Sequence, residues 1–160
     1  MATVTSSMIG VDLLNYNSTA QFAVGTQVLG TDGALFEYVN TLSAIPAGNA
    51  VGISESGNAS NLTTTLAATV KKAGVAQISI AVSTYGWVQR SGKLNVNVAA
   101  SCAMDVLLFT TGTAGILDDA TISAAVLLGL NLITSTVSNA TIGVAVAATP
   151  LFITWWSNPA

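Results

Sequence analysis

The residues whose chemistry could support catalysis are few in this 160-residue chain, and histidine is absent. Without histidine there can be no Ser-His-Asp triad, no Cys-His pair and no His-ligated metal. The single cysteine, Cys102, excludes a disulfide framework or a zinc ribbon within the chain. It lies among alanine and methionine, with no basic neighbour to lower its pKa, so we interpret it as an inert buried thiol.

Asp118 and Asp119 are the only adjacent carboxylates in the sequence. Two carboxylates could contribute ligands to Ca²⁺ or act as general acid and base. Adjacent residues of a strand point to opposite faces, however, which disfavours a catalytic dyad. The surrounding sequence, GILDDATI, favours a turn with Asp119 as the N-cap of a short helix. We therefore predict a structural role for the pair, and neither a metal site nor a cofactor.

Two short segments are the only settings in the sequence for a Ser-Lys dyad. They are Lys71-Lys72 and Ser91-Gly92-Lys93, and neither has a spacing that is specific for such a dyad. Solvated charges in turns, which keep edge strands from pairing with other chains, explain these lysines better. The sequence predicts no catalytic residue and therefore a protein that is not an enzyme.

Four aromatic residues, Tyr85, Trp87, Trp155 and Trp156, allow two interpretations. They could form a platform on which sugars stack, which would indicate a carbohydrate-binding module. They could equally belong to a core or an interface, as strand aromatics commonly do. Because neighbours on a strand face opposite ways, one ring of the Trp155-Trp156 pair should point outward. We expect this pair, together with Phe152, to anchor an interface with another protein.

The composition combines many apolar residues with very few charges. Hydrophobic types make up 51% of the chain, and charged types only 7%, against about 25% in an ordinary soluble domain. With four cations and a net charge of −3, the chain has no basic face for nucleic acid. It also lacks a run of about 20 apolar residues that could span a membrane and a basic leader. We expect a protein made in the cytoplasm, with a surface largely covered by other subunits.

Strand signals recur along the chain at intervals of roughly ten residues. The pattern predicts an all-β fold, a single antiparallel β-barrel or jelly-roll-like domain over residues 21–160. A hairpin is indicated where two alternating segments, 21–29 and 34–39, flank an Asp-Gly turn. The other predicted strands are 62–71, 75–82, 85–89, 93–98, 106–111, 125–130, 142–146 and 151–156.

Residues 1–20 form a separate segment without sustained helical periodicity. Disorder is one interpretation, because chain termini are commonly loose. The segment nevertheless holds many apolar side chains for a free tail. We therefore favour an extended arm laid across a neighbouring subunit, with interface contacts made by Met8, Leu13, Leu14 and Tyr16.

Several of these turn and strand motifs resemble the small capsid decoration (cement) proteins of tailed bacteriophages. The resemblance extends from about residue 22 to residue 130. It rests on GTQVLGTDGALFEYV (25–39), AIPAGNAV (44–51), GVAQ (74–77), YGWVQRSG (85–92), VAASC (98–102) and LFTTGTAGILDD (108–119). No motif is recognised in the first 20 residues or in residues 131–149.

The resemblance implies a β-barrel or jelly-roll protein that binds the outer surface of a phage capsid and stiffens it. It further implies contacts with the major capsid protein, self-association as a trimer in preference to a dimer, and no catalytic residues. A carbohydrate-binding module on a virion surface is the alternative. A pilus or surface-layer subunit, which would assemble without a shell, is a third.

Overall fold

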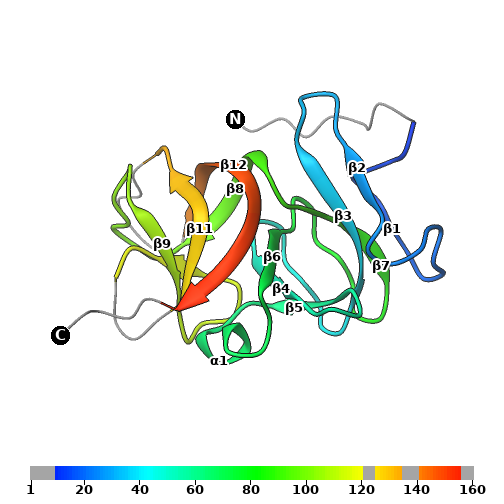
Figure 1. Cartoon of the computed structure of the whole chain (residues 1–160), viewed down its shortest axis with the longest axis horizontal. Helices are drawn as coiled ribbons and strands as arrows, with labels where there is room; N and C mark the ends of the chain where they lie inside the picture. The colour runs from blue at the N-terminus through cyan, green and yellow to red at the C-terminus, as the bar shows by residue number, and fades with distance from the viewer. Residues whose placement is uncertain (1–9, 121–124, 135–140, 156–160) are drawn as a thin grey trace.

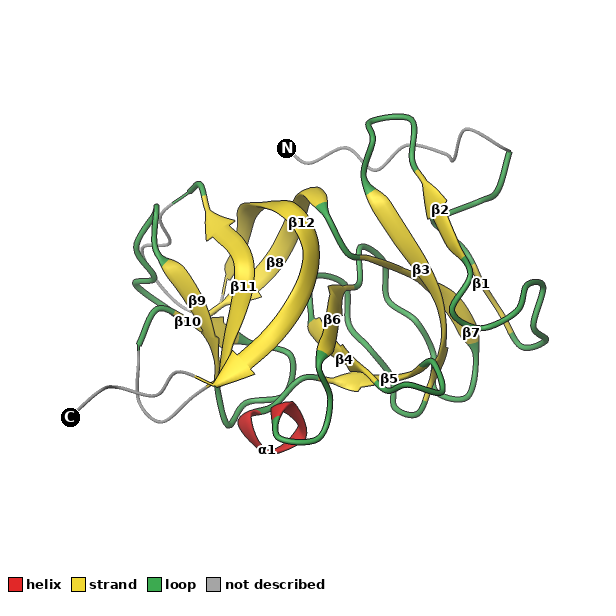
Figure 2. Cartoon of the chain, in the orientation of Figure 1, coloured by secondary structure: helices red, strands yellow, loops and turns green. Residues whose placement is uncertain are grey.

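The structure is a computed structural model, and it describes residues 10–120, 125–134 and 141–155 (Figure 1). Nearly all regular structure in these residues is β, as predicted. The strands are β1 (Tyr16–Asn17), β2 (Gln27–Leu29), β3 (Leu35–Thr41), β4 (Ala50–Ile53), β5 (Asn58–Asn61), β6 (Lys72–Val75), β7 (Tyr85–Gln89), β8 (Gly92–Val98), β9 (Leu107–Thr110), β10 (Leu117–Asp118), β11 (Ala125–Leu132) and β12 (Thr141–Trp155). One short helix, α1 (Thr64–Ala67), is drawn red in Figure 2. Across the described ranges, no helix has the length and apolar character that crossing a membrane requires.

Strand pairing closes the sheet in two places, which confirms the predicted barrel character. In the C-terminal ring, β12 pairs with β11, then come β9, β10 and β8, and β8 returns to β12. In the N-terminal ring, β7 pairs with β3, then come β5, β4 and β6, and β6 returns to β7. The rings lie side by side in Figure 1 and are joined where Phe152 of β12 pairs with Lys72 of β6. Most pairs are antiparallel, but β3–β5 and β8–β10 are parallel.

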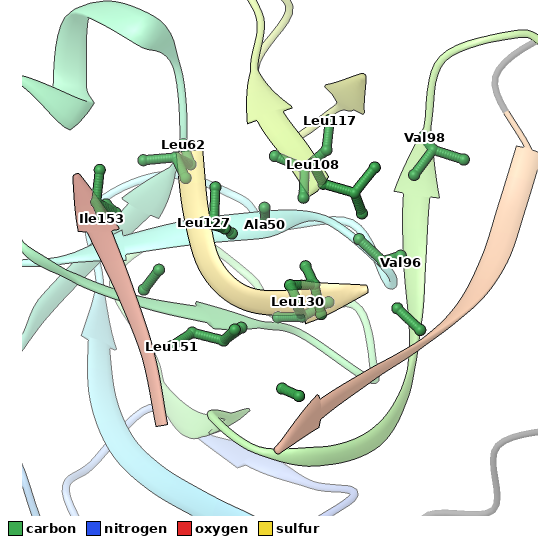
Figure 3. Packing of buried hydrophobic residues seen from close by; sticks show 14 of the residues in the cluster. Ala50, Leu62, Val96, Val98, Leu108, Leu117, Leu127, Leu130, Leu151 and Ile153 are labelled. Carbon is green, nitrogen blue, oxygen red and sulfur yellow. The ribbon is translucent and has the colours of Figure 1, made fainter. Parts of the chain in front are cut away.

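An aliphatic cluster fills the C-terminal ring and extends to the N-terminal one. Figure 3 shows its side chains converging from β8, β9, β11 and β12 on the space that these strands enclose. Residues that flank α1, among them Leu62 and Val70, also belong to this cluster. Each fully buried aliphatic side chain of this size stabilises the fold by about 1.5–3 kcal/mol relative to an exposed one.

Both faces of β3 are buried, one against the interior of the N-terminal ring and the other against a second apolar cluster. Val39 faces the interior, where it packs with residues such as Val51 and Val88. Phe36 and Tyr38 face the other way, into a cluster covered by β2 and by the segment around Leu13. The alternation predicted for residues 34–39 is therefore confirmed.

The predicted β2–β3 hairpin is also confirmed. Leu29 pairs with Leu35, and Gln27 with Glu37. Gly33 has a φ of +81°, a conformation that favours glycine, and Asp32 Oδ1 accepts a hydrogen bond from the Ala34 N–H at 3.1 Å. The first strand is shorter than expected, because a turn stabilised by a Thr26-to-Ala23 hydrogen bond precedes it.

Four strand predictions are wrong in type or extent. Residues 62–71 contain α1, because the Thr63 hydroxyl accepts a hydrogen bond from the Leu66 N–H and caps a helical turn. Of residues 75–82, only Val75 lies in a named strand, since β6 begins three residues earlier than expected, at Lys72, and ends at Val75. Residues 142–146 and 151–156 belong to one long strand, β12, through residue 155.

Candidate interaction surface

The structure brings the cysteine and the two adjacent carboxylates together. The ligand atoms of Cys102, Asp118 and Asp119 all lie within 4.8 Å of one another. Asp119 Oδ2 also accepts a hydrogen bond from the Ala103 N–H at 2.9 Å, so it fastens the loop that carries Cys102 to the end of β10. The helix expected after Asp119 would start at residues 121–124, outside the described residues.

Burial raises the pKa of the Cys102 thiol to about 11, and the charges of Asp119 and Asp118 add to this effect. Burial, followed by a hydrogen bond with Asp119, also raises the pKa of Asp118. A thiol with so high a pKa is protonated at neutral pH and is a weak nucleophile. The group therefore fastens a loop, and its geometry and charge do not indicate catalysis.

The lysine–serine segments form no dyad in the described part of the chain. The Ser91 hydroxyl accepts a hydrogen bond from the Leu35 N–H at 3.2 Å, which ties it to the hairpin strand. Lys72 Nζ lies 3.7 Å from Glu37 Oε1, so this lysine is engaged in an ion pair. Lys93 is exposed at the side of the C-terminal ring.

A buried ion pair between Glu37 and Arg90 escaped the sequence analysis. Glu37 Oε2 accepts a hydrogen bond from Arg90 Nη1 at 2.7 Å, and both side chains are almost wholly buried. Arg90 also donates from Nε to the Ala73 carbonyl and from Nη2 to the Leu151 carbonyl. The pair therefore links β3, β6 and β12 across the seam between the two rings. The sequence did indicate a buried charge here, because Glu37 lies between Leu35 and Val39 on one face of a strand. The neighbours of Glu37 on this strand are mostly buried.

The aromatic residues do not form the single platform that a carbohydrate-binding module was expected to use. Tyr85 and Trp87 lie on β7 of the N-terminal ring, where Tyr38 stacks on Tyr85 at 6.2 Å and contacts Trp87 at 4.9 Å between ring centroids. Trp155 ends β12 in the C-terminal ring, where its backbone pairs with Ala125. Its side chain and the whole of Trp156 lie outside the described residues.

The amino-terminal arm packs on its own chain over the described residues 10–20. Leu13 is 1% exposed and lies in the cluster around Tyr38 and Trp87, so its predicted role in an intersubunit interface is corrected. Leu13 is buried because residues 10–17 run along the outside of the N-terminal ring, where β1 pairs with β7. Leu14 and Tyr16 remain exposed, and Met8 lies outside the described residues.

Exposed apolar side chains gather on the outside of the C-terminal ring, on a surface that we name the outer face. It consists of Leu107 on β9, Leu128 on β11, and Val146 and Phe152 on β12. All four are exposed, because the residues beside them on each strand point into the aliphatic cluster. Strands in a sheet alternate in this way.

Strand register places the residues of the outer face in two groups. Leu128 pairs directly with Phe152, and the polar residue Asn131 pairs with both Val146 and Leu107 and lies between them. Leu128 and Phe152, opposite each other, are 46% and 48% exposed. Lys72 and Lys93 occupy the paired positions on the adjoining strands β6 and β8. An apolar centre with polar and charged residues at its edge is typical of a protein-binding surface.

Comparisons of the chain with protein-family models, with curated proteins and with solved structures gave no match.

Proposed function

We propose that the protein is a capsid decoration protein of a tailed bacteriophage, which binds the outer surface of the assembled shell through its outer face and stabilises it. The observation that supports this proposal is the set of exposed apolar side chains on the neighbouring strands β9, β11 and β12. It occurs in a chain with only 7% charged residues, so few charged side chains are present to keep this apolar surface soluble unless a partner covers it. The resemblance of its turn and strand motifs to those of cement proteins supports the same proposal.

The proposed mechanism is added interface area. Covering Leu128 or Phe152 with a partner removes apolar surface from water and stabilises the complex by about 1.5–3 kcal/mol for each side chain. The exposed Lys93 would lie at the rim, where it favours carboxylates on the major capsid protein. No covalent chemistry is involved, so the function needs neither a catalytic residue nor a cofactor.

Self-association forms part of the proposal. A stable protein interface buries about 1,200–2,000 Å², which exceeds what four exposed side chains provide. We propose that subunits dock together, as a trimer in preference to a dimer, so that several weak contacts act through multivalency. Leu14, Tyr16, Met8 and the Trp155-Trp156 pair are the proposed contributors to the contacts between subunits.

The test mixes the purified full-length protein with undecorated phage heads, sediments the heads and measures bound copies per head. Wild-type protein should saturate the heads at a fixed copy number. Leu128→Ser should weaken binding at least tenfold, from the lost burial of one leucine. Leu42→Ser is the matched control, because Leu42 is an exposed leucine in the N-terminal ring; it should bind like wild type.

Two outcomes would contradict different parts of this proposal. If wild-type protein stays in the supernatant with every head preparation offered, and scattering shows a monomer, the proposed function is wrong. If Leu128→Ser and wild type saturate heads at the same concentration, the capsid-binding surface lies elsewhere.

A further inference from the structure

A cavity of about 470 Å³ lies between residues 10–22 and the outer side of the N-terminal ring. This volume lies within the range of roughly 300–1,000 Å³ that is usual for small-molecule sites. The cavity is distinct from the outer face: its walls come from the amino-terminal segment, β1, β3 and β7, whereas the outer face is on β9, β11 and β12. Figure 1 shows β1, β3 and β7 on one side of the molecule and β9 and β11 on the other, with β12 between them.

Three aromatic rings form the floor of the cavity. Phe22 lies 5.4 Å from both Tyr38 and Trp87, measured between ring centroids, and Tyr38 lies 4.9 Å from Trp87. Tyr38 and Trp87 are almost wholly buried, whereas Phe22 is 39% exposed. The Tyr38 hydroxyl accepts a hydrogen bond from the Gln21 N–H at 3.1 Å, which holds the segment carrying Phe22 in place. The floor is therefore held in place, and the exposed part of the Phe22 ring is the aromatic surface that a ligand could contact.

Planar polar side chains form the rim of the cavity, namely Asp12, Asn15, Asn17 and Gln21. Each of Asp12 and Asn15 uses one oxygen to accept a hydrogen bond from a nearby backbone N–H. Within the described residues, the second Asp12 oxygen, the Asn15 amide nitrogen and the Asn17 amide group make no hydrogen bond. The rim thus offers both donors and acceptors beside an aromatic surface.

This chemistry selects one class of ligand. A hydrocarbon would leave the second Asp12 oxygen and the Asn15 and Asn17 amide groups facing an apolar surface, which is costly. An anion would meet the Asp12 carboxylate, and the described lining contains no lysine or arginine to balance it. A quaternary ammonium group needs several open ring faces, but two of the three rings here are buried.

We propose that this cavity binds a neutral saccharide unit, such as the end of a surface glycan. The apolar face of a sugar ring would pack on Phe22, and its hydroxyl groups would exchange hydrogen bonds with Asp12, Asn15 and Asn17. Hydroxyl groups both donate and accept, so they match a rim of one carboxylate and three amide groups. This inference does not rest on the proposed capsid function. The cavity and the outer face lie on different strands, so the protein could use both at once.

The test screens the full-length protein against an array of neutral mono- and disaccharides, with N-acetylneuraminic acid and choline as charged probes. The best neutral sugar is then titrated while tryptophan fluorescence is followed, since Trp87 lies in the floor. We expect saturable binding of a neutral sugar. Asn17→Ala and Asp12→Asn should each weaken binding about fivefold or more, as the loss of one or two hydrogen bonds predicts.

Asn131→Ala is the matched control, because Asn131 is an exposed asparagine of the C-terminal ring; its affinity should equal that of wild type. Asp12 and Asn17 lie outside the apolar clusters, so their variants are expected to keep the wild-type circular dichroism spectrum. The proposal is overturned if no neutral sugar binds at millimolar concentration, or if only a charged probe binds. It is equally overturned if Asn17→Ala and Asp12→Asn bind the sugar as wild type does.

Discussion

Arg90→Met is expected to lower the free energy of unfolding by about 3 kcal/mol, because it leaves a buried carboxylate without its closest partner. Breaking a buried ion pair from one side costs about 3–5 kcal/mol. The lower end applies here, since Lys72 at 3.7 Å and Gln27 at 3.2 Å remain near Glu37. The change also removes the donors to the Ala73 and Leu151 carbonyls. Out of a total stability of about 5–15 kcal/mol, this is a large loss.

The assay is urea denaturation followed by circular dichroism at one fixed protein concentration. Lys93→Met is the matched control, because Lys93 is exposed; its change should stay within about 0.5 kcal/mol. Glu37→Gln should cost about as much as Arg90→Met, since it leaves the buried guanidinium without a counter-charge. The double variant Glu37→Gln/Arg90→Met should cost less than the sum of these two single changes by at least about 1 kcal/mol.

Two results would refute this reasoning. A loss below about 1 kcal/mol for Arg90→Met would mean that the pair is solvated in solution. Strict additivity in the double variant would mean that Glu37 and Arg90 do not interact, whatever their single effects.

The remaining predictions concern the arm and the thiol. Leu13→Ala should cost about 2–5 kcal/mol in urea denaturation, and Leu14→Ala less than about 0.5 kcal/mol; equal small effects would show that the segment does not pack on its own chain. Cys102 should react slowly with iodoacetamide in the folded protein, with a rate that rises towards pH 11 because its pKa is raised. Its pKa is higher folded than unfolded, so its contribution to stability is complete below pH 9 and is lost as pH rises towards 11. A rate that levels off near pH 8.5, as for a free cysteine, would contradict this.

Local sequence patterns were sufficient for the elements that depend on local physics. The alternation of residues 34–39 and the Asp-Gly turn indicated the β2–β3 hairpin, and the strands β7 and β8 lie where they were expected. Helix α1 was missed because threonine favours strands on average, whereas here Thr63 uses its hydroxyl as a cap. One residue's position relative to a turn outweighed the average preference of its type.

Features that depend on distant residues were not predictable from local patterns. The closure of each ring rests on pairs such as β8–β12 and β6–β7, which no turn signal specifies. The burial of Leu13 depends in the same way on where residues 10–17 meet β7. The outer face was anticipated only at Phe152, because the exposure of Leu107, Leu128 and Val146 follows from the register between β9, β11 and β12.

The buried ion pair and the outer face meet at the seam between the rings. Backbone hydrogen bonds cross this seam, among them one from the Leu151 N–H to the Arg90 carbonyl at 2.9 Å, and side chains supply a further connection. Arg90 does so through its bonds to β6 and β12, and its guanidinium carbon also lies 5.4 Å from the centroid of the Phe152 ring. A cation at this distance attracts the ring. Arg90 thus holds Phe152 from within, while the rest of the ring stays exposed on the outer face, so the stability of the seam and the shape of the proposed binding surface depend on the same side chain.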